Sequence, residues 1–517
     1  VGSEMCIRDS CIIGGGTAGW LAALYIKRRQ PSHNITVIES SRIPIIGAGE
    51  GSTGAFSDLI HEHLGIDLED FMLKTGATQK MGIRFDNWRG DGRKFIAPID
   101  NTRTCDINTP WDTHLIHHCL HGAGPKNAHL STLCGTLADR GLSSVHISGS
   151  RIFQCSSYHF DGHHVGQYFK EIALSRGVSI IDSEYLHCAK NEQGFITSIT
   201  LVNQQTVEAD LWIDATGFAR ILSNEVGAGW HSYSKDLTCD RAIPFLLPHD
   251  EEIYPVTEAQ ALSSGWMWRI PTRDRRGCGY VFDSDFLTED QALGELEKTL
   301  GRQVDPIKVI KFDPGRAERT FCKNVVTIGL AGSFLEPLQA TSIHGTIGQL
   351  DYLMTFWLRD HGGPISDRQN DMINYHINSM VDHFADLIQL HYRSGRSDTE
   401  FWRHQQNGIA LRPQLEYLKD VCQHRWPNIN DWRQGYGVTG YGVFIYPMLE
   451  YDWINFDTLQ FSNTQTRINF EQDIGRAQAI AAEAMPHRDL VHRLQKGYIR
   501  PPIDPVIQAQ LHPLLRG

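Results

Sequence analysis

The chain has 517 residues, 41% apolar and 21% charged, so it is long enough to bury a large core and is not a disordered tail. Its net charge of −12 argues against the basic surface that a nucleic-acid-binding protein needs. No run approaches the ~20 apolar residues of a membrane-spanning helix. Eleven cysteines without a C-x-x-C pair indicate free thiols in a reducing compartment. We therefore expect a cytoplasmic globular protein without a nucleic-acid or membrane partner.

The first ten residues are unusual for the start of a fold. The chain begins with Val1 and lacks the charged and apolar regions of a secretion signal. Arg8-Asp9-Ser10 stand where a buried first strand should be apolar. We interpret residues 1–10 as a truncated or non-native leader and expect the first strand to begin at Cys11.

A glycine-rich turn follows this first strand. Cys11-Ile12-Ile13 leads into the G-x-G-x-x-G pattern of residues 14–19 and then into a helix that ends near Arg29. Such glycines let the backbone approach a pyrophosphate, whose charge lies at the helix N-terminus. The next strand ends at Glu39, where an acid can bind the ribose hydroxyls of an adenosine. A glycine turn that binds nothing is the alternative. The expected dinucleotide-binding residues are Gly14, Gly16, Thr17, Ala18, Gly19 and Glu39.

Later glycines favour FAD over NAD. Residues 47–53 form a second glycine-rich loop, and two further apolar strands, 206–213 and 325–328, lead into glycines. A late strand that returns glycines to the cofactor is typical of single-component flavin monooxygenases. No second G-x-G-x-x-G is present, so we expect no nicotinamide domain and a flavin that is reduced by another protein. The additional cofactor-binding residues expected are Gly49, Glu50, Gly51, Gly217, Gly329 and Gly332.

Three stretches carry the candidate chemistry. Lys80 lies in a half-apolar, strand-like run, where a lysine ordinarily faces water. Trp266-Met267-Trp268-Arg269-Ile270-Pro271 places two indoles on one face of a strand, as a flat aromatic wall or a core pair. The third stretch, residues 334–344, reads Phe-Leu-Glu-Pro-Leu-Gln-Ala-Thr-Ser-Ile-His.

Together these stretches resemble the flavin-dependent halogenases of the tryptophan-halogenase type. Residues 77–88 resemble the segment around that family's essential lysine, and residues 266–271 match its W-x-W-x-I-P motif at every position. Residues 334–344 resemble its E-P-L-E-[AS]-T segment. Further resemblance lies at Tyr158-His159-Phe160-Asp161, at His391-Tyr392-Arg393 and in residues 398–403.

The resemblance implies an α/β (α+β) fold, Rossmann-like and FAD-binding, of the single-component flavin monooxygenase type with an added C-terminal helical subdomain. It implies an enzyme that uses FADH2, O2 and chloride or bromide to make hypohalous acid, with a separate flavin reductase as partner. Lys80 would present the oxidant to a small aromatic substrate. Trp266 and Trp268 would keep that substrate from the flavin, and Thr341 with the amide of Ser342 would hold the halide.

One position departs from the family pattern. Gln339 stands where the family has a carboxylate, and an amide cannot take up a proton. Glu336 and His344 are the candidates for a replacement base. An aromatic flavin monooxygenase, which would hydroxylate, and a flavin-binding protein with impaired catalysis are the alternative functions.

The substrate is left open by the sequence. Residues 95–98, Phe-Ile-Ala-Pro, lack the His-x-Phe expected in members that sandwich free tryptophan, so an indole or another electron-rich aromatic is at least as well supported. Tyr441 and Phe444 belong to a glycine-rich aromatic loop, residues 435–444, that is suited to line the pocket.

The chain is expected to divide into the leader, an FAD-binding domain over residues 11–360 and a mainly helical subdomain over residues 361–517. Its histidine clusters lack zinc-finger or H-E-x-x-H spacing, and we predict no metal site. A monomer and a homodimer are both compatible with the sequence.

Overall fold

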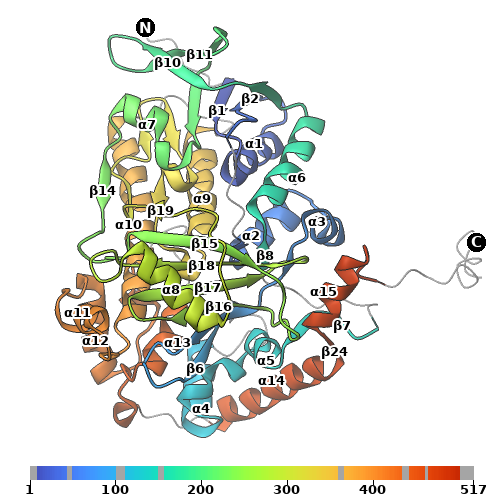
Figure 1. Ribbon diagram of the computed structural model, residues 1–517, viewed down its shortest axis with the longest axis vertical. Coiled ribbons are helices and arrows are strands. Elements are labelled where there is room, and N and C mark those ends of the chain that lie inside the picture. The colour runs from blue at the N-terminus through green and yellow to red at the C-terminus, as the bar shows by residue number, and fades with distance from the viewer. Residues whose placement is uncertain are drawn as a thin grey trace, which may run out of the picture.

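The computed structural model describes residues 9–43, 49–99, 111–148, 157–358, 366–433, 442–459 and 464–500, with the backbone only for 111–112 and 464–469. Six strands of this part of the chain form a sheet in the order β21-β22-β13-β1-β2-β9, parallel except for the β21–β22 pair. Figure 1 shows α1 and α6 packed side by side next to this sheet. The strands are β1 (Asp9–Ile13), β2 (Asn34–Glu39), β9 (Ser179–Asp182), β13 (Leu211–Asp214), β21 (Phe321–Cys322) and β22 (Val325–Thr327).

Two expected boundaries are wrong in this sheet. Strand β1 begins at Asp9 instead of Cys11, and Ser10 is buried in it because its hydroxyl hydrogen-bonds to Nε2 of His33 at 2.8 Å. The run 206–213, expected as one strand, divides between two sheets. Its first part is β12, which pairs with β11, and its second part is β13, which lies beside β1.

A second sheet of seven described strands has the order β19-β15-β18-β17-β16-β5-β6. All neighbours are antiparallel except β16 and β5. In Figure 1, β15, β16, β17 and β18 cross the middle of the molecule. The strands are β5 (Gly82–Asp86), β6 (Lys94–Pro98), β15 (Arg241–Leu247), β16 (Val256–Ala261), β17 (Gly265–Pro271), β18 (Arg276–Phe282) and β19 (Ile310–Lys311).

Smaller pairings connect the two sheets to the rest of the molecule. In one of them β8 lies between β3 and β4, so it joins the second glycine-rich loop to the segment that precedes Lys80. The remaining strands are β3 (Glu50–Gly51), β4 (Thr78–Gln79), β7 (Leu142–His146), β8 (Tyr158–Phe160), β10 (Tyr185–Lys190), β11 (Ile196–Leu201), β12 (Thr206–Glu208), β14 (Trp230–Ser232), β20 (Gly315–Ala317), β23 (Ser333–Phe334) and β24 (Ala484–Pro486).

The helices begin and end where the sequence supplies suitable caps. Helix α10 starts with a capping box formed by Ser366 and Gln369, and α3 ends at Gly76, whose φ of 69° suits a residue without a side chain. The α-helices are α1 (Thr17–Arg29), α2 (Gly54–Asp58), α3 (Leu68–Thr75), α4 (Trp111–His121), α5 (Leu133–Asp139), α6 (Gly162–Ser175), α7 (Ile221–Val226), α8 (Glu289–Leu300), α9 (Thr341–Tyr352), α10 (Asp367–Tyr392), α11 (Glu400–Asn407), α12 (Pro413–His424), α13 (Gly442–Glu450), α14 (Thr464–Glu483) and α15 (His487–Gln495). Short 3-10 or π segments are η1 (Leu59–His63), η2 (Pro125–Ser131), η3 (Gly217–Ala219), η4 (Gly329–Ala331), η5 (Pro337–Gln339), η6 (Leu353–Trp357), η7 (Ile429–Asp431) and η8 (Phe456–Thr458).

The C-terminal helices pack back onto the N-terminal half. Helix α14 contacts α4 and α5, and β24 pairs with β7 (Figure 1). The expected domain boundary at residue 360 lies outside the described residues. Within the described ranges, no helix is both long and apolar enough to cross a membrane.

Candidate active site

The turn after β1 combines close packing with one open position. Gly14 has a φ of 113°, and a Cβ there would lie 2.2 Å from the carbonyl oxygen of Ala215. A Cβ at Gly19 would lie 1.9 Å from the carbonyl oxygen of Gly14. At Gly16, the residue before α1, a Cβ would meet nothing within 4 Å. The helix has no acid in its first turn and no side-chain cap, so backbone N–H groups are available beside an open space.

The other predicted residues of this turn have protein partners. Thr17 donates its hydroxyl hydrogen bond to the carbonyl oxygen of Gly162 at 3.0 Å. Ala18 lies close to Gly329, where an added Cβ would approach it to 2.8 Å. Glu39 accepts a hydrogen bond from Nε1 of Trp20 at 2.9 Å and forms an ion pair with Lys170. Each carboxylate oxygen keeps a second lone pair for a ribose hydroxyl.

Strand β3 has one side toward the dinucleotide turn and the other toward Lys80. The Glu50 carboxylate lies against the start of α6, where a Cβ on Gly162 would come within 2.2 Å of Oε1 and 3.3 Å of the Thr17 hydroxyl. Burial, reinforced by the charge of Asp161, raises the pKa of Glu50 to about 7. A Cβ on Gly51 would instead lie 2.9 Å from Nζ of Lys80. The strand therefore stands between the two groups.

The remaining glycines approach the site from three other segments. Gly49 has a φ of 79° and packs against β17 and β18 at Ile270 and Gly277. Gly217 and Gly329 begin the short helical turns that follow β13 and β22, and both have φ near 60°. Gly332 packs against Gln349 of α9. The parallel sheet thus brings the ends of β1, β13 and β22 together, as the sequence predicts.

Lys80 is buried, contrary to what is usual for a lysine in a half-apolar strand. It lies in the connection between β4 and β5, with 1% of its surface exposed. Its ammonium donates a hydrogen bond to the carbonyl oxygen of Ser52 at 3.0 Å. Burial lowers the pKa of Lys80 from 10.5 to about 7. Near neutral pH a large fraction of the side chain is therefore an uncharged, nucleophilic amine.

Two neighbours link Lys80 to the rest of the site. The hydroxyl of Thr53, next to the lysine's partner Ser52, hydrogen-bonds to Nδ1 of His344 on α9 at 2.9 Å. On the other side, His159 of β8 bonds through Nε2 to the Thr257 hydroxyl at 2.9 Å. Burial and the nearby charge of Lys80 lower the pKa of His159 well below its usual value.

The tryptophan pair is buried in β17 but is not a flat wall. The rings of Trp266 and Trp268 are 6.1 Å apart at an interplanar angle of 55°. Trp266 also lies 6.5 Å from the ring of Trp88. Trp268 occupies the space above Gly279 on β18, where even a Cβ would come within 2.1 Å of its ring. A glycine at position 279 is therefore required for this position of the indole.

Glu336 holds the tryptophan segment in place. Its Oε2 accepts hydrogen bonds from Nε1 of Trp266 at 3.2 Å and from the hydroxyl of Tyr392 at 2.8 Å. Burial raises the pKa of Glu336 to about 7 despite these two donors. These contacts hold Trp266 and Tyr392 in place, and no hydrogen bond or ion pair joins Glu336 to Lys80 among the described residues. A catalytic role of Glu336 stays a prediction.

Gln339, at the family's carboxylate position, lies beside a histidine. Its side-chain nitrogen is 2.7 Å from Nε2 of His391, the penultimate residue of α10. Both residues are buried. The next residue along, Ala340, has a φ of 56°, a conformation that costs free energy for a residue with a side chain. This strained residue immediately precedes α9.

The expected halide residues open α9. Thr341 is buried and Ser342 half-buried, and the helix has no acidic residue in its first turn and no side-chain cap. Its first backbone N–H groups therefore face no built-in carboxylate, as an anion site requires.

Aromatic residues to which the sequence analysis gave no role at the site pack next to this segment. Phe85 stacks face to face on His391, with centroids 4.4 Å apart and an interplanar angle of 13°, and on Phe95 at 4.7 Å and 11°. Of the predicted lining residues, Phe444 is buried in α13, not in a loop, and contacts the rings of His383 and Trp432. Tyr441 lies outside the described residues.

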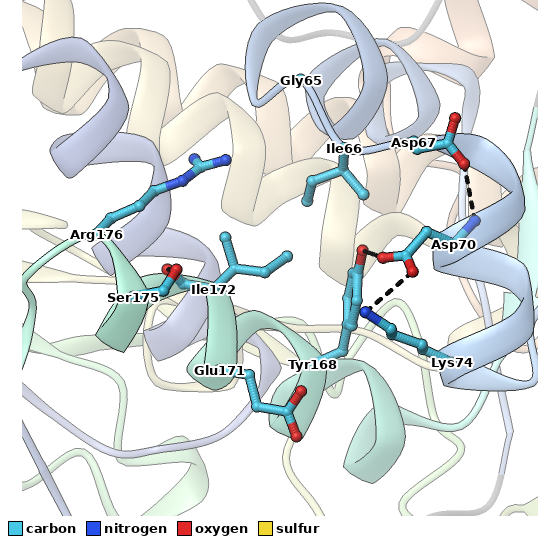
Figure 2. A pocket seen from close by; sticks show the side chains of 10 residues that line it. All are labelled: Gly65, Ile66, Asp67, Asp70, Lys74, Tyr168, Glu171, Ile172, Ser175 and Arg176. Carbon is cyan, nitrogen blue, oxygen red and sulfur yellow. Dashed lines mark hydrogen bonds and ion pairs between the residues drawn. The ribbon is translucent and has the colours of Figure 1, made fainter.

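A surface cleft of about 310 Å3 lies elsewhere, between α3 and α6. Figure 2 shows Asp70 of this cleft already paired, because it accepts from the Tyr168 hydroxyl at 2.6 Å and forms an ion pair with Lys74 at 3.0 Å. No predicted site residue lines this cleft. No group of three or more metal-ligating side chains occurs among the described residues.

The fold is that of an FAD-binding enzyme. Its buried lysine, Lys80, lies on the other side of β3 from the dinucleotide turn. A family model, tryptophan halogenase, matches residues 9–448. The chain is 32% identical over 422 residues to the tryptophan 7-halogenase KtzQ of Kutzneria sp. (strain 744), covering 77% of this chain and 78% of that protein. It is 31% identical to the tryptophan 7-halogenase RebH of Lentzea aerocolonigenes, over 76% of this chain and 77% of RebH.

A solved structure of a halogenase is also similar to this chain. The flavin-dependent halogenase Xcc4156 from Xanthomonas campestris superposes with a TM-score of 0.83 at 26% identity, over 96% of this chain and all of that one. The chain belongs to the tryptophan halogenase family. It is a halogenating oxidoreductase, and the hydroxylase alternative is not favoured.

Proposed function

We propose that this enzyme uses FADH2, O2 and chloride or bromide to make hypohalous acid, which Lys80 then presents to an indole or another electron-rich aromatic. The observation that carries the proposal is the burial of Lys80 together with its pKa of about 7. An exposed, fully charged lysine could neither be shielded from water nor act as a nucleophile toward the oxidant.

The residues around the first turn fit a dinucleotide. The open space beside Gly16 and the uncapped N-terminus of α1 suit a pyrophosphate, and Glu39 stands at the end of β2 for the ribose. Bound reduced flavin supplies the electrons for reducing O2, and the halide is oxidised to hypohalous acid. A separate flavin reductase fits a chain with a single G-x-G-x-x-G.

Thr341 and the backbone amides that open α9 are proposed to hold the halide. The helix N-terminus carries partial positive charge, and no acid of the first turn competes for it. The bond between Thr53 and His344 connects this helix to the strand end that holds Lys80. Halide and amine are thereby fixed to neighbouring parts of one framework.

Lys80 is proposed to receive the oxidant. As an ammonium it polarises hypohalous acid by hydrogen bonding, and as a neutral amine it attacks the halogen to give a haloamine. Trp266 and Trp268, fixed by Glu336 and by the space over Gly279, are proposed to keep the aromatic substrate from the flavin. With β3 between the dinucleotide turn and the amine, this separation favours halogenation over hydroxylation.

The proposed substrate is an indole or another electron-rich aromatic, in preference to free tryptophan. Family members that sandwich free tryptophan are expected to have a His-x-Phe pair in this segment. Here the two positions are Phe95 and Ala97, and Phe95 stacks on Phe85. Purified enzyme supplied with a flavin reductase, NADH, FAD, bromide and either indole or tryptophan tests this directly. Brominated indole identified by mass supports the proposal. Hydroxylated product, or unchanged substrate with FAD bound, would overturn it.

The lysine's role has a specific test. Lys80→Ala is expected to abolish halogenation, a loss of at least about 100-fold, while FAD binding is unchanged, because the amine acts on the oxidant and not on the cofactor. Lys74→Ala, which removes an exposed lysine, is the matched control and should keep full activity. Full activity in Lys80→Ala would contradict the assigned role.

A further inference from the structure

His391 occupies a position that the proposed function leaves without a task. It is fully buried, its Nε2 lies 2.7 Å from the Gln339 amide, and its Nδ1 has no hydrogen-bond partner among the described residues. A buried nitrogen without a partner is costly, so such an atom in a folded protein needs an explanation. Its neighbours on the ring faces are aromatic, with Phe85 stacked on it and Trp88 edge-on at 5.7 Å.

His391 and Lys80 both connect to the start of α9. Gln339, the partner of His391, is separated from Thr341 only by the strained Ala340. Ser52, the partner of Lys80, is followed by Thr53, which bonds to His344 of the same helix. Tyr392, next to His391, bonds to Glu336 at the other end of the 336–339 segment. The two basic side chains are thus both connected to the segment that leads into α9, His391 through Gln339 and Lys80 through Ser52 and Thr53.

We propose that His391, with Gln339 as its hydrogen-bond partner, removes the proton from the ring carbon that has been halogenated. The inference rests on the proposed function, because it assigns the last step of that reaction. It replaces the base that the sequence lacks at position 339, and it names a residue different from Glu336 and His344.

The reaction breaks the X–O and C–H bonds and forms a C–X bond and an O–H bond of water. The ring carbon gives an electron pair to the halogen of hypohalous acid, so a C–X bond forms and the X–O bond breaks, with its electrons leaving on hydroxide. The cationic ring then loses its C–H proton to Nδ1 of His391, and the C–H electrons restore aromaticity. The histidine proton passes to the hydroxide, and water is released.

The neutral imidazole suits this step. Burial lowers the pKa of His391 to about 3, so the ring is uncharged and ready to accept a proton at neutral pH. A halogenated cationic ring is far more acidic than an imidazolium, so a weak base is sufficient. Proton uptake at Nδ1 requires that Nε2–H donates to the amide oxygen of Gln339. The terminal amide torsion is soft and two-fold, so the amide turns to present that oxygen.

The decisive variant is His391→Gln. Its amide can keep the contact with Gln339 that stabilises the turn before α9, but it offers no basic nitrogen. With bromide, a flavin reductase, NADH, FAD and either indole or ring-deuterated indole, we expect turnover to fall by at least about 10-fold. We also expect the isotope effect on turnover to rise above the wild-type value, while indole binding measured by calorimetry is unchanged.

A second change provides the rescue. Gln339→Glu places a carboxylate beside the same ring, so in the His391→Gln background it should restore turnover and lower the isotope effect. In the wild-type background it should raise turnover. A His391→Gln enzyme with the wild-type rate, or a slow one whose isotope effect is not increased, would overturn the proposal. Absence of bromination by the wild-type enzyme would instead contradict the proposed function itself.

Discussion

Burial of the Lys80 amine has an energetic cost that accompanies its reactivity. No carboxylate pairs with this amine among the described residues, and its hydrogen bond goes to a backbone carbonyl. An ammonium in such surroundings loses hydration without gaining an ion pair, which is why its pKa falls to about 7. The same feature that makes the amine nucleophilic therefore destabilises the folded protein.

This cost can be measured by removing the amine. In the unfolded chain Lys80 stays protonated up to a pKa of 10.5, whereas in the folded protein it is neutral above about 7. The unfolded state binds more protons between these values, so stability rises with pH across that window. Lys80→Met should raise the free energy of unfolding by up to about 3 kcal/mol at pH 8.

The pH dependence distinguishes this linkage from a packing effect. The gain in Lys80→Met should shrink as the pH rises toward 10.5, because the amine of the unfolded wild-type chain then also loses its proton. Urea unfolding of the FAD-free proteins between pH 7 and 10 measures it. A variant that is less stable than the wild type at pH 8, or a gain that does not change with pH, would refute the explanation.

A sequence motif indicates candidate residues, whereas the contacts of those residues arise only in the fold. The sequence around Lys80 marks it as a candidate, but nothing in that sequence says that Ser52 accepts its hydrogen bond. His391 belonged to a recognised segment but had no assigned role. Its partner Gln339 is 52 residues away, and no periodicity connects the end of one helix with the turn before another.

At the scale of elements, the turn between β1 and α1 contains glycines with different tasks. Gly19→Ala would place a methyl group 1.9 Å from the carbonyl oxygen of Gly14, whereas Gly16→Ala meets only open space. We expect Gly19→Ala to lower the free energy of unfolding by about 2 kcal/mol or more. Gly16→Ala should fold with wild-type stability and bind FAD more weakly, because its methyl group enters the space proposed for the pyrophosphate.

Thermal unfolding of the FAD-free proteins measures the effect on stability. Titration with FAD measures the effect on binding. Comparable FAD affinity in Gly16→Ala and the wild type would argue against the pyrophosphate at this turn. Equal stability of all three proteins would show that the turn tolerates a side chain at Gly19.

Elements with one dominant pattern were predicted closely, and those set by pairing partners were not. The strand–turn–helix unit at residues 11–29 follows from its glycines and its apolar runs. The run 206–213 looks like one strand because its alternation continues, yet β12 pairs with β11 and β13 with β1. Sequence alternation does not identify the partner strand. Likewise, Ser10 is a buried strand residue only because His33 satisfies its hydroxyl.

In the whole molecule, segments that are far apart in the sequence pack against each other. Strand β24 pairs with β7, more than 300 residues earlier, and α14 packs on α4 and α5. Buried hydrophobic residues from both ends of the chain belong to one core, including Ile12 and Leu490. We infer that flavin-binding and C-terminal parts stabilise each other, an arrangement that a linear division into domains does not capture.

Buried histidines favour the unfolded state in acid because the folded protein resists their protonation. Burial lowers the pKa of His391 to about 3 and that of His118 and His487 to about 4. The pKa is also lowered, mainly by burial, at His33, His61, His114, His159 and His249. Below pH 6.5 the unfolded chain binds more protons at these sites than the folded protein does, so the free energy of unfolding decreases as the pH falls. For His391, His118 and His487 the decrease is about 1.4 kcal/mol per pH unit and group, down to their pKa values in the folded protein.

Buried carboxyl groups oppose this trend. The pKa values of Glu50 and Glu336 are raised to about 7, so below that pH the folded state holds more protons than the unfolded one and gains stability. Burial raises the pKa of Asp283, Asp386 and Glu450 as well. In Glu336→Gln one opposing group is gone, so the urea midpoint of the FAD-free variant should fall by more than that of the wild type between pH 7 and 5. Equal pH dependence of the two proteins would contradict the balance.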